Sequence, residues 1–200
     1  MAGFALIIVD MIRDNVNTAG HGQMDLEAKK IVPPILDLAK TFRRCGQKVV
    51  FACDSFMPDD FVFGGRMAPH AIRGTGGDEP IGDLEMQPTD LFLPKRRMSA
   101  FYKTDLDQTL RTWNVDTVAV CGIVTNVCVL LSALDAIQND FRSVIVSDAC
   151  ACHKPAIHEA TIGLYDNLIL APLFRIMTAS EITEELERLQ TAGLPASLVR

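Results

Sequence analysis

The stretch DTVAVCGIVTNVCVLLSALDAIQND, residues 116–140, decides the fold. Its first part, DTVAVCG (116–122), is short, apolar and rich in β-branched residues, which is typical of a strand buried on both faces. The part from 126 to 140 carries an apolar helix face, so it predicts a helix. A buried strand that passes directly into a helix is the repeating unit of parallel α/β folds.

The same alternation extends along the whole chain. Helices alternating with strands predict a parallel sheet with helices on both faces. We therefore predict an α/β fold, a three-layer α-β-α sandwich with a six-stranded, mostly parallel sheet, in a single domain spanning residues 1–200. The helix at 33–46 is predicted to begin at its two prolines, because proline suits a first helical turn. The predicted strands are 4–10, 48–54, 90–95, 116–122, 143–149 and 174–180, and the other predicted helices are 105–114, 126–140, 156–168 and 181–190.

Composition narrows the class of protein. Hydrophobic residues make up 48% and charged residues 22%, as in ordinary soluble globular proteins. A net charge of −6 without a long run of Lys and Arg disfavours a nucleic-acid partner. Apolar runs are too short for a membrane span, and the start has no basic leader. The six cysteines lie mostly in or beside apolar runs, so we expect a reduced, cytoplasmic protein.

Chemically capable residues gather where the predicted strands end. In parallel α/β folds the active crevice lies at the carboxyl ends of the strands. The segment 55–90 is rich in Gly, Pro and Asp, and a connection of this length is usually functional, so we predict that it covers the site. The residues at the predicted strand ends are Asp10, Asp54, Lys95, Asp148 and the turn before Cys128.

Cys128 is the candidate nucleophile. A helix N-terminus and the Lys95 ammonium are expected to lower the pKa of its thiol. Asp10 would take the thiol proton and later donate it to a leaving amine, while the backbone N–H groups of Val124 and Cys128 form an oxyanion hole. This arrangement predicts covalent acyl transfer.

Each of these residues also has a structural explanation. Cys128 is compatible with a core position, Asp10 with a turn, and Lys95 with a solvated charge in PKRR. The methionines and the other cysteines are interpreted as packing residues.

Four sequence blocks carry a family resemblance: ALIIVDM, PHAIRGTGGDEPI, LPKRRMSAFYKTDL and GIVTNVCVLLSALDA. In this order and spacing they resemble the isochorismatase-like cysteine hydrolases, which include N-carbamoylsarcosine amidases, nicotinamidases, ureidoacrylate amidohydrolases and isochorismatases. The resemblance implies an Asp–Lys–Cys triad at Asp10, Lys95 and Cys128, and a non-proline cis peptide between Ile123 and Val124. It also implies a homo-oligomer, a dimer or a tetramer.

The chain departs from this family pattern at the metal site. Nicotinamidases hold a divalent metal with an Asp-x-His pair and a later His. Here Asp54 is present, Phe56 replaces the first histidine, and His70 matches the later one. Two protein ligands are too few for a firm site, so we predict that no metal is required and that bound zinc is disfavoured.

The predicted function is that of a cysteine amidohydrolase. It would cleave a C–N bond of a small amide or N-carbamoyl (ureido) compound through a thioester and release ammonia, as an N-carbamoylsarcosine amidase does. The alternatives are a vinyl-ether hydrolase of the isochorismatase type, a nicotinamidase, and a non-catalytic protein that binds a metabolite. No nucleic-acid or membrane partner is expected. The candidate pocket residues are Arg13, Phe56, Phe61, His70, Arg73 and Thr125, and the candidates for a substrate carboxylate are Arg13, Arg66, Arg73 and Arg96.

Overall fold

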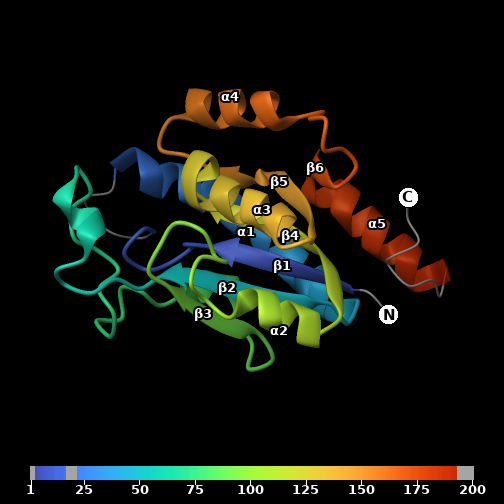
Figure 1. Cartoon of the computed structure of the whole chain (residues 1–200), viewed down its shortest axis with the longest axis horizontal. Coiled ribbons are helices and arrows are strands. Elements are labelled where there is room, and N and C mark those ends of the chain that lie inside the picture. Colours follow the sequence, from blue (N-terminus) through green and yellow to red (C-terminus); the bar gives the residue numbers. More distant parts are fainter. Residues whose placement is uncertain (1–2, 17–21, 193–200) are drawn as a thin grey trace.

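A six-stranded sheet forms the centre of the molecule (Figure 1). The structure, a computed structural model, describes residues 3–16 and 22–192. The strand order is β3-β2-β1-β4-β5-β6, and every neighbouring pair is parallel, which confirms the predicted sheet. The strands are β1 (Gly3–Val9), β2 (Lys48–Asp54), β3 (Leu91–Lys95), β4 (Val115–Ile123), β5 (Arg142–Ala151) and β6 (Phe174–Met177).

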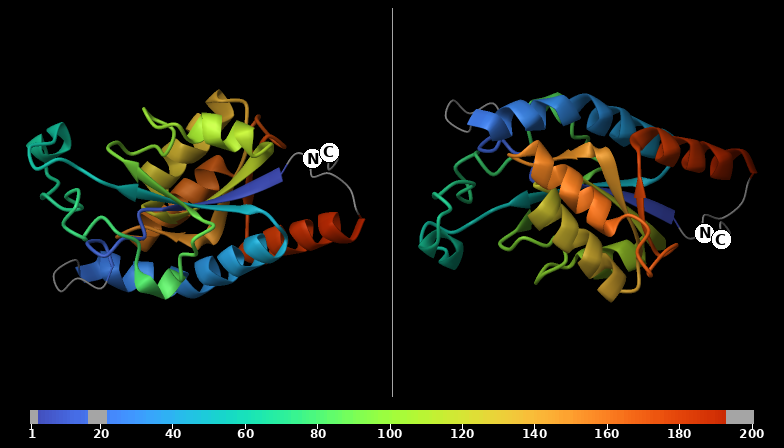
Figure 2. Two further views of the ribbon diagram at one scale, coloured as in Figure 1. Left: turned by 90° about the horizontal axis from the view of Figure 1, so that it is seen from below. Right: turned by 90° about the horizontal axis from the view of Figure 1, so that it is seen from above.

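Helices cover both faces of this sheet. Figure 2 shows α1 and α5 on one face and α2 and α3 on the other, so the three-layer arrangement is confirmed. α4 contacts β5 and the turn that precedes α3. Within the described residues, no helix combines the length and the apolar character that a membrane span requires. The helices are α1 (Gly22–Arg44), α2 (Leu106–Thr112), α3 (Leu130–Gln138), α4 (Pro155–Tyr165) and α5 (Ala179–Ala192).

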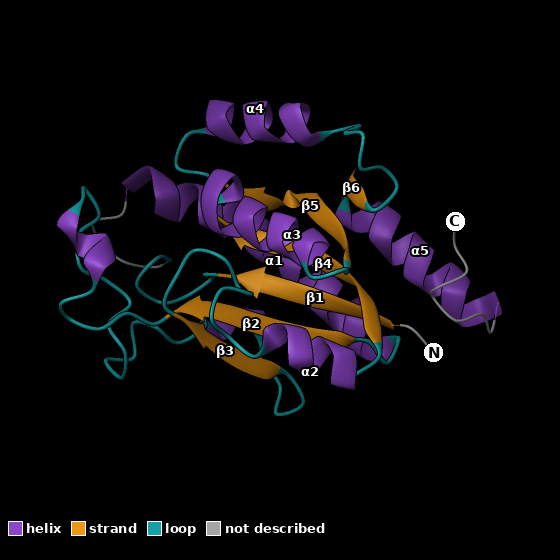
Figure 3. Cartoon of the chain, viewed as in Figure 1, coloured by secondary structure: helices purple, strands orange, loops and turns teal. Residues whose placement is uncertain are grey.

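The strand order places one crevice at the centre of the sheet. The chain winds outward from β1 in one direction and from β4 in the other, so the order reverses between these two adjacent strands. Such a reversal opens a crevice at the carboxyl ends of the strands. Figure 3 shows the long loops beyond the arrowheads of β1, β2 and β3, on this side of the sheet.

β1 and β4 approach closely at Gly122. Its φ is +109°, and a Cβ built there would lie 2.2 Å from the carbonyl oxygen of Val9. Glycine tolerates this backbone conformation and leaves room for the neighbouring strand. Gly122 therefore lets the two central strands end side by side.

The first helix is longer than predicted. α1 begins at Gly22 rather than at Pro33, so Pro33 and Pro34 lie inside it. A proline removes a backbone donor but does not end a helix whose packed face continues. Ala28 and Ile31 before the prolines are buried, as are Ile35, Leu38, Ala39 and Phe42 after them, and this continuous face holds the helix together.

The fifth strand is also longer than predicted, so Asp148 does not lie at the carboxyl end of a strand, where the site was predicted. β5 continues to Ala151, beyond the predicted end at 149. Asp148 is exposed, and its Oδ1 accepts a hydrogen bond of 2.8 Å from the backbone N–H of Ala179. Its carboxylate therefore interacts with the first residue of α5.

Candidate active site

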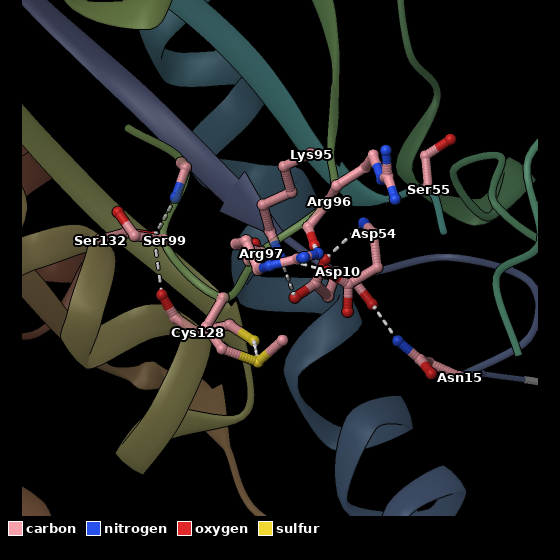
Figure 4. Close-up of polar contacts among 12 residues, drawn as sticks. Asp10, Asn15, Asp54, Ser55, Lys95, Arg96, Arg97, Ser99, Cys128 and Ser132 are labelled. Carbon is pink, nitrogen blue, oxygen red and sulfur yellow. Dashed lines mark hydrogen bonds and ion pairs between the residues drawn. The ribbon is translucent and has the colours of Figure 1, made fainter. Parts of the chain in front are cut away.

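Three buried charges meet at the ends of the first three strands. Asp10 follows β1, Asp54 ends β2 and Lys95 ends β3. The register pairs Asp54 directly with Lys95, which brings their side chains to the same level of the sheet. The Lys95 Nζ lies 2.9 Å from Asp10 Oδ2 and 2.5 Å from Asp54 Oδ1 (Figure 4). Its third contact is the carbonyl oxygen of Arg97 at 3.3 Å, so the three ammonium hydrogens all have acceptors.

The carboxylate of Asp10 is held from two sides. Its Oδ1 accepts a hydrogen bond of 2.7 Å from the backbone N–H of Asp54, while its Oδ2 binds Lys95. The Asn15 side chain donates to the Asp10 carbonyl at 3.0 Å. Asp10 therefore has a fixed orientation, although it lies just outside β1.

Cys128 lies in the turn that joins β4 to α3. The peptide bond between Ile123 and Val124 is cis. The next residues, Thr125–Val129, form one π-helical turn that leads into α3, so the predicted helix starts with a wider turn. Backbone N–H groups in the first turn of a helix have no partner within that helix. Cys128 thus lies in the first turn of this helix, four residues after Val124.

The thiol and the two carboxylates converge. The Cys128 Sγ and one oxygen from each of Asp10 and Asp54 all lie within 4.8 Å of one another. These residues come from the ends of β1, β2 and the β4–α3 turn, as the predicted crevice requires. The sequence motifs far apart in the chain therefore form one buried cluster.

Burial dominates the electrostatics of this cluster. Burial and repulsion from Asp10 raise the pKa of Asp54 to about 7, although Lys95 opposes the rise. Burial lowers the pKa of Lys95, but attraction to the carboxylates of Asp10 and Asp54 outweighs it and raises the pKa above its usual value. Lys95 is therefore an ammonium group, and Asp54 changes its charge near neutral pH.

The expected lowering of the Cys128 pKa is wrong for this structure. Burial raises the pKa of the thiol well above its usual value, and Asp10 and Asp54 add to this, while Lys95 opposes it. Lys95 attracts the thiolate, but burial together with repulsion from the two carboxylates outweighs this attraction. The thiol is consequently neutral at rest and needs a base within reach to become a nucleophile.

Two residues outside the predicted site, His158 and Met98, contact this turn. The Thr125 hydroxyl lies 2.9 Å from Nδ1 of His158 on α4, and this links the turn to an outer helix. The Met98 sulfur lies 3.9 Å from the Cys128 Sγ. Met98 is not among the predicted site residues; the signal that could have indicated it is its place three residues after Lys95, in the block LPKRRMSAFYKTDL.

The candidate pocket residues do not all converge. Phe56 is fully buried, and its ring packs against Phe63 and His70 with centroid distances of 5.3 Å and 5.6 Å. Phe61, in contrast, is exposed and lines a groove. Thr125 is buried against His158.

Most of the candidate arginines for a substrate carboxylate already have protein partners. The Arg13 guanidinium lies 3.0 Å from Glu79, and the Arg73 Nε donates to the hydroxyl of Ser55 at 3.0 Å. Arg96 binds Asp60 at 2.9 Å.

The residues near Asp54 do not fit a divalent metal well. Asp10, Asp54 and Cys128 include three potential ligand atoms, but the Lys95 ammonium is bonded to both carboxylates. A cation bound there would be repelled by this charge. At His70, the other predicted ligand, one ring nitrogen is already engaged, because its Nδ1 lies 3.0 Å from the carbonyl oxygen of Ala68.

The fold and the cluster define a class: doubly wound α/β proteins with an Asp–Lys–Cys cluster at the central crevice. The model of the isochorismatase domain matches residues 4–180, so the chain belongs to the isochorismatase family. An isochorismatase family protein of Bacillus subtilis, PncA, is 32% identical over 82% of this chain and 95% of its own length.

Solved structures agree with this assignment. The N-carbamoylsarcosine amidase from Thermoplasma acidophilum is 30% identical, with a TM-score of 0.75, over 88% of this chain and 96% of that chain. A pyrazinamidase of Pyrococcus horikoshii, solved in complex with zinc, is 26% identical with a TM-score of 0.75 and covers 88% of this chain and 98% of its own. The family thus includes relatives named as amidases, one of them with bound zinc.

Proposed function

We propose that this protein is a cysteine amidohydrolase that cleaves a small amide or N-carbamoyl compound and releases ammonia. The observation that carries the proposal is the convergence of Cys128, Asp10 and Lys95 in one buried cluster. The similarity to a named N-carbamoylsarcosine amidase supports the same reaction class.

In this proposal Asp10 acts as the base. The neutral Cys128 thiol transfers its proton to Asp10 as the sulfur attacks the substrate carbonyl, forming an S–C bond. The backbone N–H groups of Val124 and Cys128 hold the resulting oxyanion. Asp10 returns the proton to the nitrogen, the C–N bond breaks and ammonia leaves. Water then hydrolyses the thioester, which yields the acid and restores the thiol.

Lys95 has two roles in this reaction. Its ammonium holds the Asp10 carboxylate at 2.9 Å and fixes its position within the cluster. Once the thiolate forms, the same positive charge stabilises it across the cluster. We propose that no metal takes part, because the Lys95 ammonium binds one oxygen of each carboxylate and would repel a cation there, and because Phe56 supplies no ligand atom.

The test is ammonia release from a panel containing acetamide, nicotinamide, N-carbamoylsarcosine, other N-carbamoyl amino acids and ureidoacrylate. Wild type is compared with Cys128→Ala and, as a matched control, with Cys45→Ala at the far end of α1. We expect release by wild type and Cys45→Ala, and a loss of at least about a thousandfold in Cys128→Ala.

Other outcomes would contradict the proposal. Full release by Cys128→Ala would exclude a thioester mechanism. If isochorismate were cleaved by Cys128→Ala but not by Asp10→Ala, ether hydrolysis with Asp10 as the acid would replace it. Retained binding of a panel compound, without turnover of any of them, would favour a metabolite-binding role.

A further inference from the structure

An apolar groove lies next to the candidate nucleophile. It has a volume of about 510 Å³ and is formed by the 3₁₀ helix Phe61–Gly64, the loop after β3 and the first turns of α3. Leu131 in its wall follows Cys128 by one helical turn. The apolar groove is lined mainly by Phe61, Val62, Met67, Met98, Tyr102 and Leu131.

Met98 connects this groove to the sulfur of Cys128. Met98 lines the groove, and its sulfur lies 3.9 Å from the Cys128 Sγ. The loop that carries Met98 is fixed, because Ala100 donates its backbone N–H to the Ser132 hydroxyl, which donates to the Cys128 carbonyl. Met98 is therefore a fixed apolar neighbour of the reacting atom.

The sulfur thus has both charged and apolar neighbours. An oxygen of Asp10, which binds Lys95, lies within 4.8 Å of it, and the Met98 sulfur lies 3.9 Å away. A carbonyl under attack lies about 3–3.5 Å from the sulfur, and its substituent begins one bond farther away. A substituent directed away from the ion pairs would contact Met98 first and then enter the groove.

The groove favours an uncharged substituent. Of its lining residues, Arg97 is bound to Asp60 at 2.9 Å, and Asp135 accepts a hydrogen bond from Gln138. The Phe61 ring is 86% exposed, and Leu131 is 40% exposed, so both present apolar surface to an incoming chain. Burying such surface is favourable without a charged partner.

We propose that the apolar groove is the subsite for the acyl substituent, and that the preferred substrates are amides or ureides carrying an uncharged aliphatic or aromatic group. Met98, Leu131 and Phe61 would determine this specificity. The inference rests on the proposed function for its catalytic meaning, but the groove can be tested without turnover.

The first experiment compares kcat/KM for acetamide, butanamide, hexanamide and succinamic acid. We expect kcat/KM to rise about three- to fourfold per buried methylene, and to be lowest for the charged compound. Leu131→Gln and Phe61→Ser should each lower the ratio of kcat/KM for hexanamide to kcat/KM for acetamide at least fivefold. Leu164→Gln, on the exposed side of α4, is the matched control and should behave as wild type.

The second experiment needs no hydrolysis. The Cys128 sulfur displaces iodide from iodoacetamide or N-hexyliodoacetamide, forming an S–C bond as the C–I bond breaks and the thiol proton is lost. We expect N-hexyliodoacetamide to label Cys128 at least tenfold faster than iodoacetamide, and Leu131→Gln to remove that preference.

These results separate the two proposals. Faster labelling by the hexyl reagent without any amide turnover would support the groove and contradict the amidohydrolase. Turnover that depends on Cys128, with equal or falling rates along the amide series and no labelling preference, would overturn the groove alone. A change of sedimentation coefficient in Leu131→Gln, with loss of turnover of every amide, would also overturn it and indicate a contact between copies of the chain.

Discussion

The Lys95 ammonium lies between the carboxylates of Asp10 and Asp54, at 2.9 Å and 2.5 Å, and all three side chains are buried. One positive charge thus faces two potential negative charges. The pKa of about 7 at Asp54 is the consequence, since burial and repulsion from Asp10 disfavour its second negative charge. This relationship makes the contribution of Asp54 to the stability of the protein depend on pH.

Asp54→Asn should change the pH dependence of stability. The pKa of Asp54 is about 7 in the folded protein and about 3.9 when unfolded, so between these values the folded state binds more protons. The contribution of Asp54 to the free energy of unfolding therefore falls by about 2–3 kcal/mol as the pH rises from about 5 to 8. Urea unfolding of wild type and Asp54→Asn across this range should show the difference. A parallel pH dependence in the two proteins would contradict it.

Lys95→Met should destabilise the protein by about 3–5 kcal/mol at pH 8, because two buried carboxylates lose their counter-charge. The free energy of unfolding in urea measures this loss. Lys95→Met combined with Asp54→Asn should recover part of it, since one of the unpaired charges is removed. If the change in the free energy of unfolding of the double variant equals the sum of the changes in the two single variants, the proposed coupling between Lys95 and Asp54 is wrong.

Gly122→Ala should prevent close packing of β1 against β4. The new Cβ would lie 2.2 Å from the carbonyl oxygen of Val9 at a φ of +109°. We expect a loss of about 3 kcal/mol or more in the free energy of unfolding. Gly163→Ala is the matched control, because Gly163 is exposed in α4 with open space around it. That change should stabilise the protein by about 0.5–1 kcal/mol.

The contact between Thr125 and His158 should contribute measurably to stability. Its length is 2.9 Å, and the Thr125 side chain is buried. A double-mutant cycle of Thr125→Val and His158→Ala, followed by urea unfolding, should give a coupling energy of about 0.5–1.5 kcal/mol. Independent effects of the two substitutions would show that the contact does not hold the turn.

Removal of divalent metals should leave the proposed activity intact. After dialysis against EDTA, we expect kcat/KM for a turned-over amide to change less than twofold, because Lys95 binds the carboxylates that a metal would need. Ammonia release measures the effect. A loss of activity that zinc restores would require a metal site near Asp54.

Much of the fold and the cluster could be predicted from the sequence. Short β-branched runs alternating with helical periodicity indicated the parallel sheet, since a strand covered on both faces must be apolar throughout. The residues at the strand ends then indicated a site at the carboxyl edge of the sheet, and Asp10, Lys95 and the turn before Cys128 do meet there. Asp148 does not, because β5 runs past it to Ala151.

Other features depended on contacts that are distant in sequence. The start of α1 was missed, because the packing of Ala28 and Ile31 sustains the helix through Pro33 and Pro34. Tertiary packing of this kind outweighs the local preference of proline for a first turn.

The sequence by itself determined the strand–helix alternation, the parallel sheet and the identity of the groups at its rim, because these follow from hydrophobic periodicity and from where each strand ends. Only the tertiary structure decided the ionisation of those groups and the surroundings of the sulfur. A pKa depends on burial and on charges brought from other strands, so the neutral Cys128 thiol and the shared Lys95 were not visible in any local motif. The contact between Met98 and Cys128, and the apolar groove beyond it, likewise exist only once β3 and β4 lie in one sheet.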